Sequence, residues 1–360
     1  MKIKGGELYF IRENDVRTGE LTPYVKIGIV RDKAGDDRDS NDRALEHQTG
    51  NPRKLFVESI IKTPSVTEIE NIIHNLYAEE RIYGEWFDFT SDRFKSVKKM
   101  AMDLVKMAID NQEKFEIADL FSSKASRAES IKPTPEIVDW HSKLLAAEVR
   151  VKSCVALQSE IKEAFKAIIS APVETGTQKE KQATLEPYVK VQEKKARTEF
   201  DVEAFKLARP ELYEKFVKII LSTPKGSFTI SRPKDLILDL SEIDIELYNY
   251  SHEVKEELVR YASDLATQDD LFTARLKLLG FEAKASWDKE IAQANLKAFC
   301  QDFSGIEGIC KWNRVSKETE IFDKEAMIEA HPKIAEKFMT EVIAAPSVIM
   351  QRKRAYRNGS

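Results

Sequence analysis

The sequence predicts an α+β fold class: a small domain on a three-stranded antiparallel sheet with flanking helices, followed by a mainly helical region. Three observations lead to this prediction. Short β-rich runs and amphipathic runs alternate over the first 112 residues, helical periodicity dominates the rest, and a 25-residue stretch occurs twice in that second part. The chain has 360 residues, 42% of them hydrophobic, which is enough for two or more domains.

The first 112 residues alternate between runs typical of strands and runs typical of helices. The expected strands cover residues 7–11, 24–30 and 54–63. The expected helices cover residues 43–48, 64–81 and 91–109. Asn41 or Asp42 is placed to cap the first of these helices, and Ser65 or Thr67 the second. The segment GEWFDF at 84–89 reads as a short strand or an extended segment.

The second part of the chain contains a predicted tandem duplication. FDVEAFKLARPELYEKFVKIILSTP at 200–224 aligns without gaps on FDKEAMIEAHPKIAEKFMTEVIAAP at 322–346, with ten identities in 25 positions. Upstream, KLLAAE at 143–148 pairs with KLLGFE at 277–282. Two anchors in the same order indicate two related helical modules. The predicted organisation is an N-terminal domain at 1–112, a linker at 113–133, module one at 134–230, a connecting helical segment at 231–267, module two at 268–350 and a basic tail at 351–360.

Composition excludes several classes of protein. The net charge is −4, so binding to nucleic acid would depend on local patches rather than on total charge. Cys154, Cys300 and Cys310 have no spacing typical of a disulfide framework or a zinc site, which favours a reducing, cytoplasmic location. No apolar run reaches the roughly 20 residues of a membrane span, and no signal peptide is expected at the N-terminus.

Polar residues of the N-terminal part fall at spacings that bring them together in pairs. The pairs are Tyr9 and Lys26 on neighbouring strands, Arg43 and His47 four apart on one helix, and Glu70 and His74 four apart on another. Each residue taken alone also has a structural interpretation: a packed strand tyrosine, a solvent-facing lysine, or a surface contact between helical neighbours. In GEWF, Trp86 and Phe87 are expected to pack in the core.

These segments, in this order, resemble the GIY-YIG endonuclease superfamily, in the branch whose second half-motif reads KIG. The motifs are LYF, VKIG, R-x4-QTGNP, E-x3-H and GEWF, within about residues 6–90. The resemblance implies an endonuclease that hydrolyses DNA phosphodiester bonds with Mg²⁺ or Mn²⁺, in phage, mobile-element or defence biology. It also implies roles: Tyr9 as the first motif tyrosine, Lys26 in place of the second, Arg43 as the catalytic arginine, Glu70 as the metal ligand and His47 as an accessory histidine.

The sequence departs from the family pattern in two places. The glycine of the first half-motif is displaced, because Glu7 and Leu8 precede Tyr9. The loop before Arg43 is longer than usual, which leaves Arg31 and Arg38 as competitors for its role.

The chemistry of phosphodiester hydrolysis suggests how these residues would act. Tyr9 would activate water, and Lys26 would lower the pKa of Tyr9. Arg43 would clamp the scissile phosphate through its planar guanidinium. Glu70 alone would suffice for Mg²⁺, which keeps most of its waters. A histidine at position 47 or 74 would orient water or relay a proton.

The helical part offers weaker candidates. Lys311, Trp312 and Arg314 mix aromatic and basic side chains, as in a surface that stacks on a nucleic-acid strand, or else form a core tryptophan with solvated cations. The basic run at 351–357 would contact phosphate or remain a solvated end. Two further interpretations stay open for the whole chain. One is a degenerate module that binds nucleic acid or protein without cutting, and the other is a scaffold that forms homo-oligomers through the helical repeats.

Overall fold

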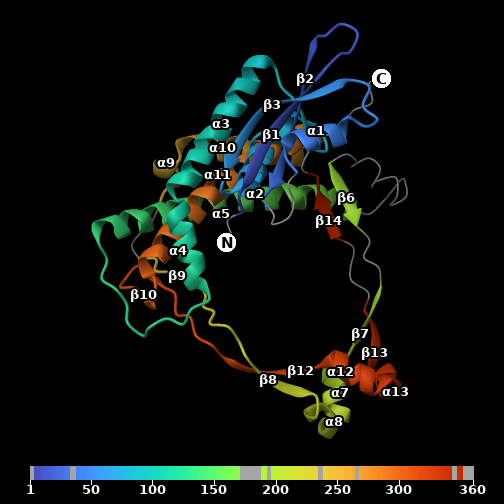
Figure 1. Ribbon diagram of the computed structural model, residues 1–360, viewed down its shortest axis with the longest axis vertical. Coiled ribbons are helices and arrows are strands. Elements are labelled where there is room, and N and C mark those ends of the chain that lie inside the picture. Colours follow the sequence, from blue (N-terminus) through green and yellow to red (C-terminus); the bar gives the residue numbers. More distant parts are fainter. Residues whose placement is uncertain are drawn as a thin grey trace.

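The fold class is confirmed by a computed structural model: an N-terminal antiparallel sheet with helices is followed by a helical region (Figure 1). The structure describes residues 4–32, 38–170, 188–192, 196–233, 238–263, 267–342 and 347–351. Within these ranges, no helix is long and apolar enough to span a membrane.

The N-terminal sheet has five strands rather than the predicted three. They are β1 (Gly6–Asn14), β2 (Leu21–Arg31), β3 (Lys54–Thr63), β4 (Arg81–Tyr83) and β5 (Trp86–Asp88), in the order β3-β1-β2-β5-β4. The three predicted strands are neighbours in the order β3-β1-β2, with β3 at one edge of the sheet, and β3 has the predicted bounds. The additional strands come from the segment around GEWF, because β5 pairs along the outer edge of β2 from Tyr24 to Lys26.

Helices pack on both faces of this sheet. They are α1 (Ser40–Gln48), α2 (Val66–Leu76), the 3-10 turn η1 (Ala78–Glu80) and α3 (Ser91–Asp110). The N-cap of α1 is Asp39, whose side chain accepts from the backbone N–H groups of Asn41 and Asp42; the prediction of either of those two as the cap was wrong. The N-cap of α2 is Ser65, as one of the two alternatives had it, although its side chain makes no capping hydrogen bond.

The two faces of the sheet bury different residues because side chains alternate along a strand. One face holds the main core, in which Leu8, Phe10 and Ile27 pack against α2 and α3. The other face holds a smaller cluster with Tyr9, Ile11, Ala44 of α1 and Leu55 of β3. The candidate catalytic residues belong to this second face and to the edge of β2.

The helical region is built on two long helices that pack together. Its helices are α4 (Gln112–Ser122), α5 (Pro135–Ser170), α9 (Leu240–Ile243), α10 (Ile245–Ala262) and α11 (Gln268–Cys300). The predicted linker at 113–133 was therefore wrong in its first half, which is helical. The Phe115 ring of α4 stacks on the Trp287 ring of α11 with centroids 5.8 Å apart.

The N-terminal domain shares its core with α11. Trp287, Ile291 and Ala294 of α11 are part of the same buried cluster as α2 and α3. Gly280 allows this close approach, since a Cβ atom there would lie 3.2 Å from the Cα of Leu76. The N-terminal domain and the long helix α11 are therefore packed as one body.

Short strand pairs, which the sequence did not predict, connect the two halves of the helical region. The strands are β6 (Val189–Gln192), β7 (Arg197–Phe200), β8 (Val217–Leu221), β9 (Thr229–Ile230), β10 (Gly305–Ile306), β11 (Cys310–Lys311), β12 (Glu318–Phe322), β13 (Met339–Val342) and β14 (Ser347–Met350). The cross-pairs are β6 with β14, β7 with β13, β8 with β12 and β9 with β11. Each pair thus joins a strand that follows α5 to one that follows α11.

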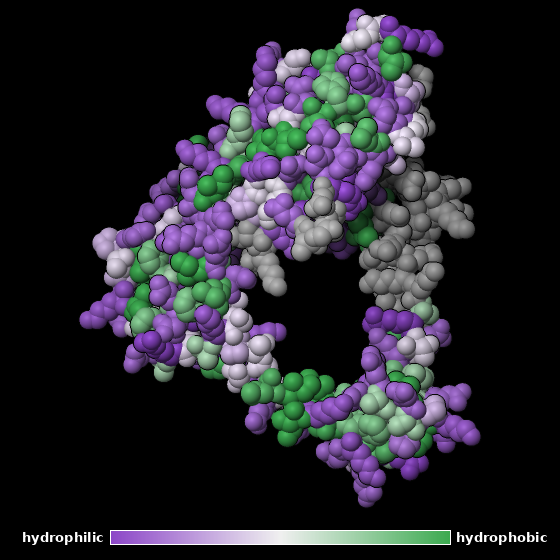
Figure 2. Space-filling model, in the orientation of Figure 1, coloured by the Kyte–Doolittle hydropathy of each residue, from purple (hydrophilic) through white to green (hydrophobic). Residues whose placement is uncertain are grey.

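The repeated stretch forms a small unit at a distance from the rest. It contains α7 (Val202–Ala208), α8 (Pro210–Glu214), α12 (Lys324–Ala330), α13 (Pro332–Ala335) and the 3-10 turn η2 (Glu336–Phe338). A cluster of phenylalanines around Phe200 and Phe205 fills its centre. We call this the distal unit; an opening separates it from the body, with the β8–β12 ribbon on one side (Figures 1 and 2). Each copy of the repeated stretch contains two short helices, α7 and α8 or α12 and α13. The duplication itself remains a prediction.

Candidate active site

The Tyr9 side chain lies across Gly28. These residues face each other in the antiparallel pairing of β1 and β2, and Tyr9 is only 1% exposed. A Cβ atom at position 28 would lie 2.6 Å from the Cζ atom of Tyr9 and closer still to its hydroxyl. Glycine at this position therefore makes room for the tyrosine ring on the face that carries α1.

Lys26 is on the same face as Gly28, two residues earlier on β2. Its side chain is 8% exposed, and its ammonium forms an ion pair with the carboxylate of Glu85. The Glu85 carbonyl also accepts a hydrogen bond of 3.0 Å from the Ile27 N–H. The predicted role for Lys26 does not fit this geometry, because its charge is directed to Glu85 and not to Tyr9.

Helix α1 contributes Arg43 and His47. Burial raises the pKa of the Tyr9 hydroxyl, and the hydrogen bond and charge of Arg43 oppose this only in part. Arg43 is also paired with Glu46. Burial, together with the charge of Lys26, lowers the pKa of His47, and the His47 Nε2 atom has no hydrogen-bond partner within the described chain. His47 is thus held neutral with a free ring nitrogen.

Helix α2 brings Glu70 and His74 to the edge of β2. Burial, and next the negative charge of Glu85, raise the pKa of Glu70 to about 7. Burial, and next the charge of Arg81, lower the pKa of His74 to about 4. The His74 Nε2 atom lies 3.1 Å from the Ile27 carbonyl oxygen, so the neutral ring donates to it. His74 therefore fixes α2 against β2 rather than exposing its ring to a substrate.

The six predicted residues are brought into one electrostatic neighbourhood, and Glu85 is common to it. Its charge acts on the pKa of Tyr9, His47, Glu70 and His74. Burial acts to raise the pKa of Glu85, but the hydrogen bond and charge of Lys26 outweigh it, so this pKa is lowered. Sequence reasoning treated GEWF as a packing feature and missed its glutamate. Phe87 is indeed buried, and the signal for Glu85 was an acidic residue next to two packing aromatics.

The donor set at Glu70 fits a hard divalent cation. The ion would be held by the Glu70 carboxylate, whose pKa is raised by burial first and by the negative charge of Glu85 next, so that a bound cation would favour its charged form. Within the described ranges, no group of three or more His, Cys, Asp or Glu side chains is arranged to hold a metal ion. One carboxylate with water and a phosphate oxygen suffices for Mg²⁺, whereas zinc requires a fuller set of protein ligands.

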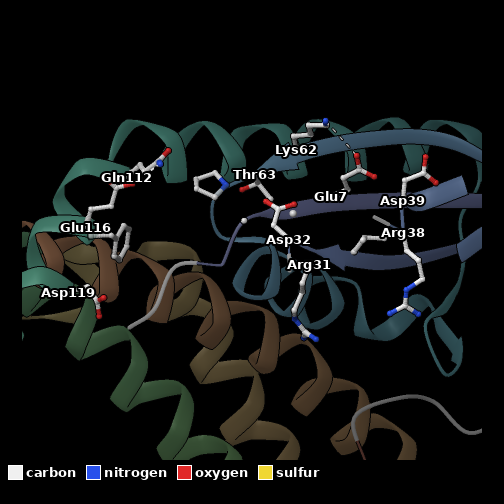
Figure 3. A pocket seen from close by; sticks show the side chains of 15 residues that line it. Glu7, Arg31, Asp32, Arg38, Asp39, Lys62, Thr63, Gln112, Glu116 and Asp119 are labelled. Atoms are coloured by element: carbon white, nitrogen blue, oxygen red, sulfur yellow. Dashed lines mark hydrogen bonds and ion pairs between the residues drawn. The ribbon is translucent and has the colours of Figure 1, made fainter. Parts of the chain in front are cut away.

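A cavity of about 880 Å³ lies beyond the end of the sheet, next to α4 (Figure 3). Acidic side chains prevail around it: Glu7, Asp32, Asp39, Glu116 and Asp119 against Arg31, Arg38 and Lys62. This surplus of negative charge is unfavourable for binding a polyanionic strand.

The contacts of Arg31, Arg38 and Arg43 distinguish these three candidates for the catalytic arginine. In Figure 3 the Arg31 and Arg38 side chains both extend away from Asp32. Arg31 donates to the Thr67 hydroxyl and acts on Glu70 by its charge, while Arg38 is paired with Glu46. Of the three candidates, Arg43 is the one with a hydrogen bond to Tyr9.

The predicted nucleic-acid contact around Trp312 does not fit the structure. Trp312 is buried, and the Arg314 guanidinium stacks on it with 3.8 Å between its Cζ atom and the ring centroid. Arg314 is 0% exposed and donates to the carbonyls of Lys124 and Gln301, among others. These two side chains hold the α11 end of the body together, and of this group Lys311 is exposed. The basic run at 352–357 lies outside the described residues.

Comparison with known families identifies one domain. Residues 6–102 match the family model of the T5orf172 domain. No curated protein and no solved structure matches the chain. The T5orf172 domain is phage-associated and has an endonuclease-like fold of the GIY-YIG or HNH kind. Residues 6–102 are therefore similar to a nuclease-type domain.

Proposed function

We propose that this protein is a metal-dependent endonuclease that hydrolyses DNA phosphodiester bonds. One observation carries the proposal: side chains from β1, β2, α1 and α2, predicted independently from motif order, lie in one partly buried neighbourhood. It combines a phenol, cations and a carboxylate, the groups needed to activate water and to stabilise a negatively charged transition state.

Four side chains, from β1, α1 and α2, have a direct role in this proposal. Arg43 binds the scissile phosphate from α1, beside the Tyr9 hydroxyl. The Tyr9 hydroxyl stays protonated because burial raises its pKa, and it orients the attacking water through a hydrogen bond. The neutral His47 ring nitrogen accepts the proton that this water loses as its oxygen attacks the phosphorus atom and the P–O bond to the leaving oxygen breaks. A divalent ion at Glu70 would neutralise charge at a phosphate oxygen.

The test uses duplex, single-stranded and branched DNA, and RNA, each with Mg²⁺, Mn²⁺ or EDTA. We expect cleavage of at least one DNA substrate that requires the metal, and a loss of about 100-fold or more in Tyr9→Phe, in keeping with the weight of a positioned proton-transfer group. A folded wild-type protein that cuts none of these substrates, in either metal, would contradict the proposal and favour the non-cutting alternative.

For the helical region we propose a protein-binding or self-associating role rather than contact with DNA. In the distal unit, residues 318–342 carry seven acidic and three basic side chains, and residues 197–222 carry five of each. Its β8–β12 ribbon exposes Ile219 (68%) and Leu221 (67%), seen as a green patch in Figure 2. An acidic and apolar surface repels phosphate and suits a protein partner. Retention of DNA by this region in a binding assay would contradict the assignment.

A further inference from the structure

The GEWF segment supplies a polar side chain to the face of the sheet that carries Tyr9. Glu85 lies directly before β5, and β5 is fixed against β2 by the pairing of Lys26 with Trp86. The hydrogen bond from the Ile27 N–H to the Glu85 carbonyl continues this ladder by one residue. The backbone of Glu85 is therefore held at the edge of β2, next to Lys26.

Lys26 depends on this neighbour. Its side chain is almost fully buried. Within the described chain, the Lys26 ammonium donates a hydrogen bond to the Glu85 carboxylate, with which it also forms an ion pair. A long, flexible lysine holds one orientation only when a fixed partner binds its charged end. Two consecutive residues of the aromatic motif, Trp86 and Phe87, pack on opposite faces of β5 and so fix this strand beside Lys26.

We propose that Glu85 is a positioning residue of this site, which acts by holding the Lys26 ammonium at the face that carries Tyr9 and His47. This inference rests on the nuclease function proposed above. In it, GEWF has two functions: its aromatic residues build the core, and its glutamate orients the lysine that replaces a tyrosine in the second half-motif. Glu85 need not touch the substrate or the metal.

The experiment compares single-turnover DNA cleavage by wild type, Glu85→Gln, Lys26→Met and the double variant. We expect Glu85→Gln to lower kcat by about 10- to 100-fold, as for other groups that orient a functional side chain, with KM little changed. Because Glu85 acts through Lys26, the double variant should be no slower than Lys26→Met alone. Glu85→Asp, which keeps the charge, should recover part of the lost rate.

The controls separate this inference from its alternatives. Glu80→Gln removes a carboxylate that is likewise ion-paired, to Arg93, but lies away from the site, and should cleave at the wild-type rate. Unfolding curves for every variant identify any that is not folded, and Glu85→Asp replaces Glu85→Gln if the latter is not. Multiplicative losses in the double variant, or full rescue of Glu85→Gln by added Mg²⁺, would overturn the role through Lys26. If the wild type itself does not cut DNA, the nuclease proposal fails, whereas an active wild type with a fully active Glu85→Gln refutes only the role of Glu85.

Discussion

Glu70 is expected to weaken the fold of the metal-free protein, and Glu70→Gln should therefore stabilise it. The pKa of Glu70 is raised from 4.5 to about 7 by burial and by the charge of Glu85. The folded state thus holds this proton more tightly than the unfolded state does. Stability from this group is fully present below pH 4.5 and is lost as the pH rises through 7. The shift corresponds to at most about 3 kcal/mol at pH 8.

The assay is urea unfolding of wild type and Glu70→Gln at pH 4.5 and pH 8, without divalent ions. The variant should be more stable by up to about 3 kcal/mol at pH 8 and nearly equal to wild type at pH 4.5. The opposite shift of His74 is present in both proteins and cancels in the difference. Added Mg²⁺ should stabilise the wild type at pH 8 and leave the variant unchanged. A variant that is equally or less stable than wild type at pH 8 would refute the reasoning.

Four further substitutions test the geometry. Gly28→Ala should displace the Tyr9 ring, cost about 1–3 kcal/mol in the free energy of unfolding and abolish most cleavage, as measured by urea unfolding and a plasmid assay; wild-type activity would contradict the close packing. Arg314→Ala should destabilise the fold by at least about 2 kcal/mol because several carbonyls lose their donor, while Lys311→Ala leaves both stability and DNA affinity unchanged; weaker DNA binding by folded Lys311→Ala would restore the predicted contact. Gly280→Leu should separate α11 from α2 and expose the junction to limited proteolysis, and an unchanged digestion pattern would argue against the shared core.

The centre of the N-terminal fold was predictable because local patterns determine it. Alternating apolar residues gave β3 its bounds, and helical periodicity placed α3 to within a residue of both ends. The cap of α1 was not predicted correctly because several Asp and Asn residues lie together there. The backbone conformation selects among them: Asp39 is extended, and the helix begins at the next residue. Motif order located Tyr9 and Glu70 for the same reason: each lies at a fixed point on a strongly patterned element.

The electrostatics of the site were less predictable. Because Tyr9 and Lys26 lie on neighbouring strands, we expected Lys26 to lower the pKa of Tyr9. That effect depends on where the ammonium at the end of the long Lys26 side chain lies. Glu85, which lies directly before the neighbouring strand β5, attracts the Lys26 ammonium, and burial decides the direction of the shift in the Tyr9 pKa. The cross-paired short strands of the helical region were missed because their partners lie at least 80 residues away, as Ile230 and Cys310 do in β9 and β11. Pairing at such separation leaves no local pattern.

The most direct test of the central claim is the rate of DNA cleavage as a function of Mg²⁺ concentration, for wild type and Glu70→Gln at pH 8. Both proteins should be folded, since the substitution is expected to stabilise. We expect saturable, Mg²⁺-dependent cleavage by the wild type and no cleavage by Glu70→Gln at any Mg²⁺ concentration. Equal cleavage by the two proteins would contradict it, because the metal would then not depend on the carboxylate of α2.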